Sequence, residues 1–330
     1  MKHLFLSVFV IGASFPMLQA QVVSTAPVGF VSKTVPSNSD ATYAPAFQPA
    51  AAYVGAVGTL VDGDTISVAG TSPGWATDQF KFTHYLLIGS GDREGIFAEI
   101  VGNSANTIDV VFFVGNFGTQ EGDRVETGDE IKVVPYWTLG TLLPDGSVPN
   151  GTKVLLYNRT EGGVNKAAST IYTTFTGFGW YNGPTNGNSQ VIYPDESFII
   201  RAPVGESVNL TQTGSVPMDK IRTLLISATP GQDMDIRVTS GVPVPTPLGE
   251  IFNPGAAGNG DKVLVFDESA SGQNKSAATI ITYFHGFGWY NGPTNLSGLE
   301  IQPGQGLLYR KAAANSGSDV SVNFKPSYQP

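Results

Sequence analysis

Short segments in which apolar and polar residues alternate run through the whole chain, and helical periodicity is absent. Alternation with a period of two is typical of strands that bury one face. Gly, Pro, Asn and Asp bound most of these segments, as turn residues do. The clearest examples are Thr65–Val68, Tyr85–Ile88, Thr107–Phe113, Glu130–Val134, Val154–Tyr157 and Val263–Phe266. The pattern therefore predicts an all-β protein with short antiparallel strands in compact barrels or sandwiches.

A duplication organises the second half of the chain. The ten residues GFGWYNGPTN occur at 177–186 and again at 286–295, 109 positions later. Residues 139–201 align without a gap on 248–310, with 29 identities in 63 positions. Two copies of one supersecondary unit are expected to share one fold. We therefore expect an N-terminal β-barrel or sandwich module followed by two tandem homologous β-units, with boundaries at 21–138, 139–216 and 217–330.

Comparison of the two copies distinguishes the faces of one predicted strand. Its first, third and fifth positions are identical in the two copies, whereas the positions between them differ. Identity at every second position is expected when one face of a strand packs on a core. We therefore predict that the retained side chains are buried. They are Ile171, Thr173 and Phe175, with their counterparts Ile280, Thr282 and Phe284.

The duplicated GFGWYNGPTN segment is identical on both faces of the chain. Gly177 and Gly179 indicate a sharp bend around Phe178, and Asn182-Gly183 fits a hairpin turn. Turn geometry does not explain the aromatic pair, whose side chains leave opposite faces. We expect Trp180 to point inward and Tyr181 to point outward. The candidate ligand-binding residues are Trp180, Tyr181, Asn182 and Asn186, with Trp289, Tyr290, Asn291 and Asn295 in the second copy.

The N-terminus resembles a secretory signal peptide. Lys2 and His3 precede an apolar segment from Leu4 to Phe15, and a cleavage site follows near Ala20. This apolar segment is too short to span a bilayer, and no later segment approaches the roughly 20 apolar residues that a membrane helix needs. We expect residues 1–20 to be removed and the mature protein to be exported to the periplasm, the cell surface or the medium.

Composition limits the partners and the source of stability. The formal charge is −9 and there is no basic run, which argues against nucleic acid and anionic lipid as partners. The chain contains no cysteine, so its stability rests on packing and sheet hydrogen bonds rather than on disulfides.

Familiar catalytic patterns are weak in this sequence. Gly70-Thr71-Ser72-Pro73-Gly74 fits a nucleophile elbow, but no helix follows it. Beyond the signal peptide the histidines are His84 and His285, and the second is replaced by threonine in the other copy. No zinc-ligand spacing appears, and Asp62-Gly63-Asp64 before a strand is more typical of a turn than of a calcium site. We expect no catalytic residues, no metal and no cofactor.

Several longer segments carry a resemblance to a known family. They are PVGFV at 27–31, SPGW at 72–75, YLLIGSGDREGIFAEIVGNSANTIDV at 85–110, GDEIKVVPYWTLGTLLP at 128–144, GDKVLVFDESASGQNKSAAT at 260–279 and QPGQGLLYRKA at 302–312. They resemble an uncharacterised family of exported bacterial proteins with an internal duplication. The resemblance implies an exported all-β protein and no known activity. Basic residues follow the Gly-Trp pair in that family, whereas Tyr181-Asn182-Gly183-Pro184 stand there in this chain.

Two classes of function fit these observations, and a third is kept as an alternative. The first is a non-catalytic structural or interaction protein of the cell exterior. The second is a glycan-binding protein that stacks the duplicated aromatic residues on sugar rings and gains avidity from two sites. The third is an enzyme acting on polysaccharide, which needs two carboxylates facing each other across a cleft. The expected partner is a cell-envelope or extracellular polysaccharide or another surface protein.

Overall fold

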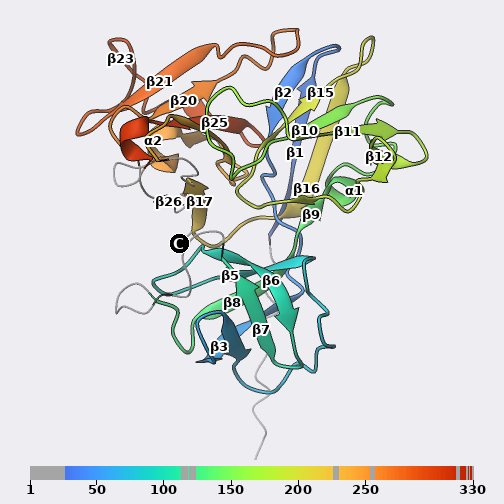
Figure 1. The fold of residues 1–330 in the computed structure, drawn as a ribbon, viewed down its shortest axis with the longest axis vertical. Coiled ribbons are helices and arrows are strands. Elements are labelled where there is room, and N and C mark those ends of the chain that lie inside the picture. The colour runs from blue at the N-terminus through green and yellow to red at the C-terminus, as the bar shows by residue number, and fades with distance from the viewer. Residues whose placement is uncertain are drawn as a thin grey trace, which may run out of the picture.

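The computed structural model describes residues 27–112, 118, 124–225, 230–252, 257–316, 320–324, 326 and 328. The predicted signal peptide lies outside these residues. The fold is all-β, as predicted, with 43% of the described residues in strands and 4% in helices. Figure 1 shows two lobes, with a barrel in the lower half of the view and two larger sheets in the upper half.

The lower lobe is a closed six-stranded barrel. Buried side chains such as Val57, Ile66, Leu86, Ile100 and Ile131 form its core. A barrel of this size has an interior that its own side chains fill. In order around the barrel the strands are β3 (Tyr53–Leu60), β4 (Thr65–Val68), β7 (Thr107–Val111), β6 (Phe97–Asn103), β5 (His84–Ile88) and β8 (Glu130–Pro135).

The upper lobe contains two six-stranded sheets with the same strand order, one for each copy of the duplication. The first sheet runs β13 (Thr185–Asn186), β12 (Gly179–Asn182), β11 (Thr170–Phe175), β10 (Lys153–Leu156), β15 (Phe198–Arg201) and β2 (Asp40–Tyr43). The second sheet runs β23 (Thr294–Asn295), β22 (Gly288–Asn291), β21 (Thr279–Phe284), β20 (Lys262–Val265), β25 (Gly306–Lys311) and β18 (Met234–Thr239).

Additional strand pairs and short helical turns complete each copy in matching places. The additional pairs are β1 (Val28–Val35) with β16 (Val208–Ser215), β9 (Trp137–Thr138) with β14 (Val191–Ile192), β17 (Ile221–Leu225) with β26 (Val320–Phe324), and β19 (Thr246–Pro247) with β24 (Glu300–Ile301). Single helical turns α1 (Leu139–Leu142) and α2 (Leu248–Ile251) precede β10 and β20, and a 3₁₀ turn covers Ala313–Asn315.

The strand pairing shows that the first repeat begins before the barrel, and not after residue 138 as the duplication suggested. Strands β1 and β2 precede the barrel in the chain, yet they pair with β16 and β15 of the first copy. In the second copy the equivalent strands, β17 and β18, directly precede the rest of the unit. The first repeat therefore comprises 28–43 together with 137–215, and the barrel is inserted between β2 and β9. The second repeat comprises 221–324.

Each repeat extends one loop to the edge of the other repeat's sheet, and these two exchanged loops hold the repeats together. The loop between β20 and β21 reaches the first sheet, where the Asn274 N–H donates to Asp40 Oδ2 at 2.7 Å. Asn274 Oδ1 accepts from Arg201 Nη2 at 2.8 Å. Asp40 and Arg201 also form a two-pronged ion pair, with N–O distances of 2.7 and 2.8 Å. The loop of the second repeat thus completes an ion pair at the edge of the first sheet.

The reciprocal contact uses the equivalent residues. The Asn165 N–H donates to Asp235 Oδ2 at 2.7 Å, and Asn165 Oδ1 accepts from Arg310 Nη2 at 3.0 Å. Both asparagines have a φ of 51°, a left-handed conformation that asparagine tolerates better than most residues. Equivalent residues of the two repeats therefore make equivalent contacts, as in a two-fold symmetric dimer, but within one chain.

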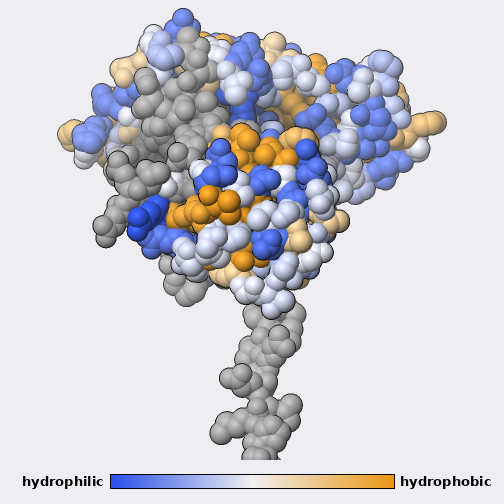
Figure 2. Space-filling model, turned by 60° about the horizontal axis from the view of Figure 1, so that its bottom comes forward, coloured by the Kyte–Doolittle hydropathy of each residue, from blue (hydrophilic) through white to orange (hydrophobic). Residues whose placement is uncertain are grey.

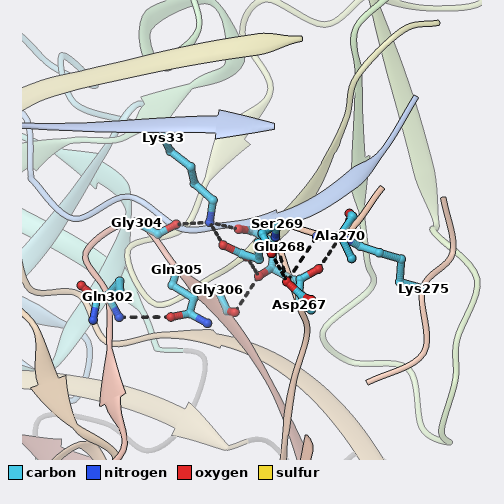
Figure 3. A network of polar contacts seen from close by, with 11 residues as sticks. Lys33, Asp267, Glu268, Ser269, Ala270, Lys275, Gln302, Gly304, Gln305 and Gly306 are labelled. Atoms are coloured by element: carbon cyan, nitrogen blue, oxygen red, sulfur yellow. Dashed lines mark hydrogen bonds and ion pairs between the residues drawn. The ribbon is translucent and has the colours of Figure 1, made fainter. Parts of the chain in front are cut away.

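Lys33 on β1 also joins the repeats (Figure 3). Its Nζ donates to the carbonyl oxygens of Thr42 at 2.6 Å and Gly304 at 3.3 Å, and pairs with Glu268 Oε2 at 2.5 Å. Glu268 also accepts a hydrogen bond from Thr42 Oγ1. Burial lowers the pKa of the Lys33 ammonium, and the attraction of Glu268 opposes that effect. The network fixes the exchanged loop of the second repeat against β1 and β2.

Polar and aromatic contacts attach the barrel to the upper lobe. Lys132 on β8 pairs with Asp219 at 2.7 and 2.9 Å, and Arg222 on β17 donates to the Glu94 carbonyl at 2.7 Å. Next to these contacts, Tyr85 and Tyr136 belong to a buried cluster that Leu224 of the second repeat joins. The barrel is therefore packed against the repeats and is not merely tethered to them.

The expected burial of the retained strand face is wrong. Phe175 and Phe284 are 46% and 44% exposed, and Ile171 and Ile280 are exposed as well. The buried face is the variable one, which carries Tyr172 and Thr174 in β11 and Ile281 and Tyr283 in β21. Side chains on the buried face differ between the copies because changes in their volumes compensate for one another. The retained side chains point outward.

Apolar residues also reach the surface of the barrel. Val54, Leu60, Val61, Phe82 and Val111 are exposed there, and Figure 2 shows hydrophobic surface on the side of the molecule turned toward the viewer. Within the described part of the chain, none of the helices combines the length and hydropathy needed to traverse a bilayer.

Candidate functional site

The duplicated segment forms a pair of tight hairpins in each repeat. A turn at residues 176–178 joins β11 to β12, and a turn at Gly183-Pro184 joins β12 to β13. Gly183 has a φ of 55°, so it supplies the left-handed position, and Asn182 is the last residue of β12. Figure 1 shows the hairpins of the two repeats at opposite ends of the upper lobe.

Trp180 and Trp289 anchor these hairpins and point inward, as expected. Both are among the largest fully buried side chains. Trp180 Nε1 donates to the Leu143 carbonyl at 2.8 Å, and Trp289 Nε1 donates to the Phe252 carbonyl at 3.1 Å. A buried indole with its N–H satisfied is a stable anchor. Because neither ring reaches the surface, these two candidates position the hairpins and do not contact a ligand.

The close approach of a side chain to the bend explains why glycine stands before each tryptophan. Gly179 has a φ of 85°, and a Cβ there would lie 2.3 Å from Asn188 Oδ1. That oxygen accepts a hydrogen bond from the Trp180 N–H at 2.8 Å. In the second repeat Ser297 Oγ accepts from the Trp289 N–H at 3.0 Å. The backbone around the bend is therefore held by a side chain as well as by its turn geometry.

Tyr181 lies on the outer face of its hairpin together with Asn186. The tyrosine is half-buried, and its hydroxyl accepts a hydrogen bond from Asn186 Nδ2 at 3.3 Å. The ring also meets Phe175 edge to face, with 6.2 Å between the centroids. Asn182 is exposed, but it follows Tyr181 directly in the strand and so leaves the opposite face. Of the predicted polar partners, only Asn186 is brought to the tyrosine.

The second hairpin repeats this arrangement. Asn295 Nδ2 donates to the Tyr290 hydroxyl at 3.2 Å, and Phe284 meets the Tyr290 ring at 6.2 Å. Asn291 ends β22 in the place that Asn182 takes in β12. The two sites are therefore built alike, although their sheets lie in different repeats.

Sequence reasoning missed two phenylalanines at the bends. Phe178 and Phe287 are 70% and 74% exposed, the most exposed aromatic side chains of the hairpins. Their signal in the sequence was a bulky apolar residue retained between two turn glycines. We call the set Phe175, Phe178 and Tyr181 the first aromatic tip, and Phe284, Phe287 and Tyr290 the second aromatic tip.

Residues considered for catalysis lie in separate parts of the structure: His84 and Asp62 belong to the barrel, whereas His285 lies in the bend of the second aromatic tip. His84 packs on Phe80 and shares a 2.8 Å hydrogen bond with the neighbouring Thr83, and burial lowers the pKa of its imidazole. His285 is exposed at a hairpin turn. Asp62 accepts from the Asp64 N–H at 2.9 Å, as in an ordinary turn. No set of three potential metal ligands converges within the described residues.

Comparisons of the chain with protein-family models, with curated proteins and with solved structures gave no significant match.

Proposed function

We propose that the protein is an exported, non-catalytic binding protein that attaches to a polymer of the cell exterior through its two aromatic tips. The observation that carries this proposal is the exposure of Phe178 and Phe287, at 70% and 74%, within a segment that is identical in both repeats. Exposed apolar groups that recur on rigid hairpins are typical of binding surfaces.

The positions of the tips favour an extended partner over a compact one. One tip lies at each end of the upper lobe, so a single molecule engages two separate sites on one polymer, or joins two polymers (Figure 1). Two sites that bind at once gain avidity without any new contact. A partner with a repeating chemical unit fits two identical sites.

We favour a polysaccharide as this polymer. Each tip combines aromatic rings, which stack on the apolar face of a sugar, with an asparagine amide beside a tyrosine hydroxyl. Binding sites for small molecules commonly combine apolar rings with a few placed hydrogen-bonding groups. The amide and hydroxyl already bond to each other and are free to exchange that bond for one with a sugar hydroxyl.

The test measures retention of the mature protein on insoluble polysaccharides, with purified peptidoglycan and a β-1,4-linked glucan as the probes. The variants combine F178A with Y181A for the first tip and F287A with Y290A for the second. Each should lower retention about tenfold or more through lost avidity, and the combined fourfold variant should abolish it. Melting temperatures should fall by only a few degrees, because Phe178 and Phe287 are exposed and the two tyrosines are half-buried, so each substitution costs about 1 kcal/mol or less.

The matched control is Phe30→Ala. Phe30 is as exposed as Phe287, at 74%, but lies on β1, away from both tips. Its loss should leave retention unchanged. Equal effects of F30A and the tip variants would show that retention reflects general hydrophobicity, and retention that survives the fourfold variant would refute the assignment of the tips.

A further inference from the structure

A cavity of about 520 Å³ lies between the two sheets of the upper lobe, beside the exchanged loops. Side chains of the second sheet, Leu264, Ile280 and Leu308, form an apolar part of its wall, and Ile199 of the first sheet contributes. Ile280 is 48% exposed, so the cavity opens to solvent on that side. The volume is in the range of sites that take small organic molecules.

Charged side chains form another part of the wall, and most of them already have partners. Arg310 pairs with Asp235 at 2.7 and 3.0 Å, and Arg159 pairs with Asp195 at 3.0 and 2.8 Å. Lys166 Nζ donates to backbone carbonyls at 2.6 and 3.2 Å, and Lys275 Nζ does the same at 2.6 and 2.9 Å. These groups are fixed by the fold itself.

Arg237 on β18 is different. Its guanidinium lies over the Tyr157 ring, 3.9 Å from the centroid, and forms part of the cavity wall. No protein group accepts a hydrogen bond from Nε or Nη1, although both atoms are enclosed. An arginine keeps its charge in proteins, so enclosed N–H groups without acceptors cost folding free energy. Such a group in a native structure calls for an explanation.

The approximate symmetry of the repeats shows what Arg237 lacks. The equivalent residue of the first repeat is Thr42, because Arg237 pairs with Leu308 and Thr42 pairs with Ile199 in the same register. Thr42 Oγ1 is hydrogen-bonded to the carboxylate of Glu268. The residue equivalent to Glu268 in the exchanged loop of the first repeat is Arg159, which pairs elsewhere. The chain thus supplies a carboxylate at one of the two equivalent places and none at the other.

We propose that the cavity binds a small monocarboxylate with a hydrocarbon body. The carboxylate accepts hydrogen bonds from Arg237, in the role that Glu268 has beside Thr42. The hydrocarbon body lies against Leu264, Ile280 and Leu308. A single negative charge fits better than two, because Asp40 and Asp235 also line the cavity and repel a second negative charge. This site is separate from both aromatic tips and does not depend on their function.

The test uses the mature protein with hexanoate and benzoate as probes, followed by isothermal titration calorimetry and thermal shift. Hexanol is the neutral probe of matched shape, and inorganic phosphate is the anion without a hydrocarbon body. Both carboxylates should bind and raise the melting temperature. Hexanol should bind at least about tenfold more weakly, as expected for loss of a charge-assisted hydrogen bond. Phosphate should produce no shift.

Arg237→Met removes the charge and keeps much of the length of the side chain. It should weaken carboxylate binding about 30-fold or more, whereas Lys153→Met, which removes an exposed charge of the first sheet outside the cavity, should leave binding unchanged. Ile280→Trp keeps Arg237 but fills the cavity, and it should block binding. In the absence of probe, R237M should melt at the same temperature as the unmodified protein or higher, because a buried charge without an acceptor is removed.

Four results would overturn the proposal. The first is no binding of either carboxylate, and the second is equal affinity for hexanoate and hexanol. The third is equal affinity for phosphate and hexanoate. The fourth is a drop of several degrees in the melting temperature of R237M without probe, which would make Arg237 a structural residue.

Discussion

Glu196 should make the folded protein less stable as the pH rises from about 4.5 to about 7. Burial raises the pKa of its carboxyl from 4.5 to about 7, and the neighbouring Asp195 adds to the shift while Arg159 opposes it. The folded state therefore holds this proton more tightly than the unfolded state does. The stabilisation is complete below the unfolded pKa of 4.5 and is lost as the pH rises through the folded pKa.

The size of the effect follows from the pKa shift. Each pKa unit corresponds to about 1.4 kcal/mol, so ionisation of Glu196 costs up to about 3 kcal/mol of unfolding free energy above pH 7. Glu196→Gln removes this titration and keeps the shape of the side chain. The variant and the unmodified protein should melt alike near pH 4.5, and the variant should melt roughly 4–6 °C higher at pH 8.

The assay is calorimetric melting of both proteins at pH 4.5, 6, 7 and 8, with Glu206→Gln as the control. Glu206 is an exposed carboxylate of the same repeat, so its variant should follow the unmodified protein at every pH. Other titrating groups cancel because only differences between variants are compared. A difference between E196Q and the unmodified protein that stays constant with pH, or grows toward low pH, would refute the reasoning.

Three further outcomes follow from the structure. Trp180→Phe should lower the unfolding free energy by about 2–4 kcal/mol, since it leaves the Leu143 carbonyl without its donor and opens space in the core; a urea midpoint within error of the unmodified protein would contradict the anchoring role. Phe175→Ala should cost about 1 kcal/mol or less, because the ring is 46% exposed; a loss of about 3–5 kcal/mol in the same denaturation assay would restore the buried assignment. Asn274→Ala and Asn165→Ala should lower the melting temperature by similar amounts, as expected from their matching contacts, and a large effect of only one would show that the two loop exchanges differ in strength.

The sequence predicted the all-β fold, the duplication and the inward tryptophans, because alternation and exact repetition are local signals. The prediction of which face is buried in β11 and β21 was wrong. Core residues vary in compensating ways, so Tyr172 and Thr174 of β11 become Ile281 and Tyr283 of β21. The large ring moves by two positions while the core stays filled. The outward face contributes instead to the cavity wall through Ile280 and to the tips through Phe175 and Phe284. Identity between the copies does not by itself distinguish a buried face from an exposed one.

Other features had no signal within the duplicated segment. The correspondence of β2 with β18 is hidden because the barrel separates β2 from the rest of its repeat and the two strands share little sequence. Arg237 lies on β18, so its equivalence to Thr42 on β2 could not be read from the aligned residues. The cavity is a property of two sheets facing each other, which a pattern along one chain does not encode.

The insertion of the barrel between β2 and β9 has a consequence for the order of folding. The barrel strands, from Tyr53 to Pro135, are contiguous, and so are the strands of the second repeat, from Ile221 to Phe324. Strand β1 instead pairs with β16, so Val28 can pair with Ser215 only after the whole barrel has been synthesised. Closing so long a loop slows folding and leaves the unpaired strands open to wrong partners in the meantime. We therefore expect the barrel to form first and the first repeat to complete its sheets last, with β1 and β2 left unpaired for the longest time.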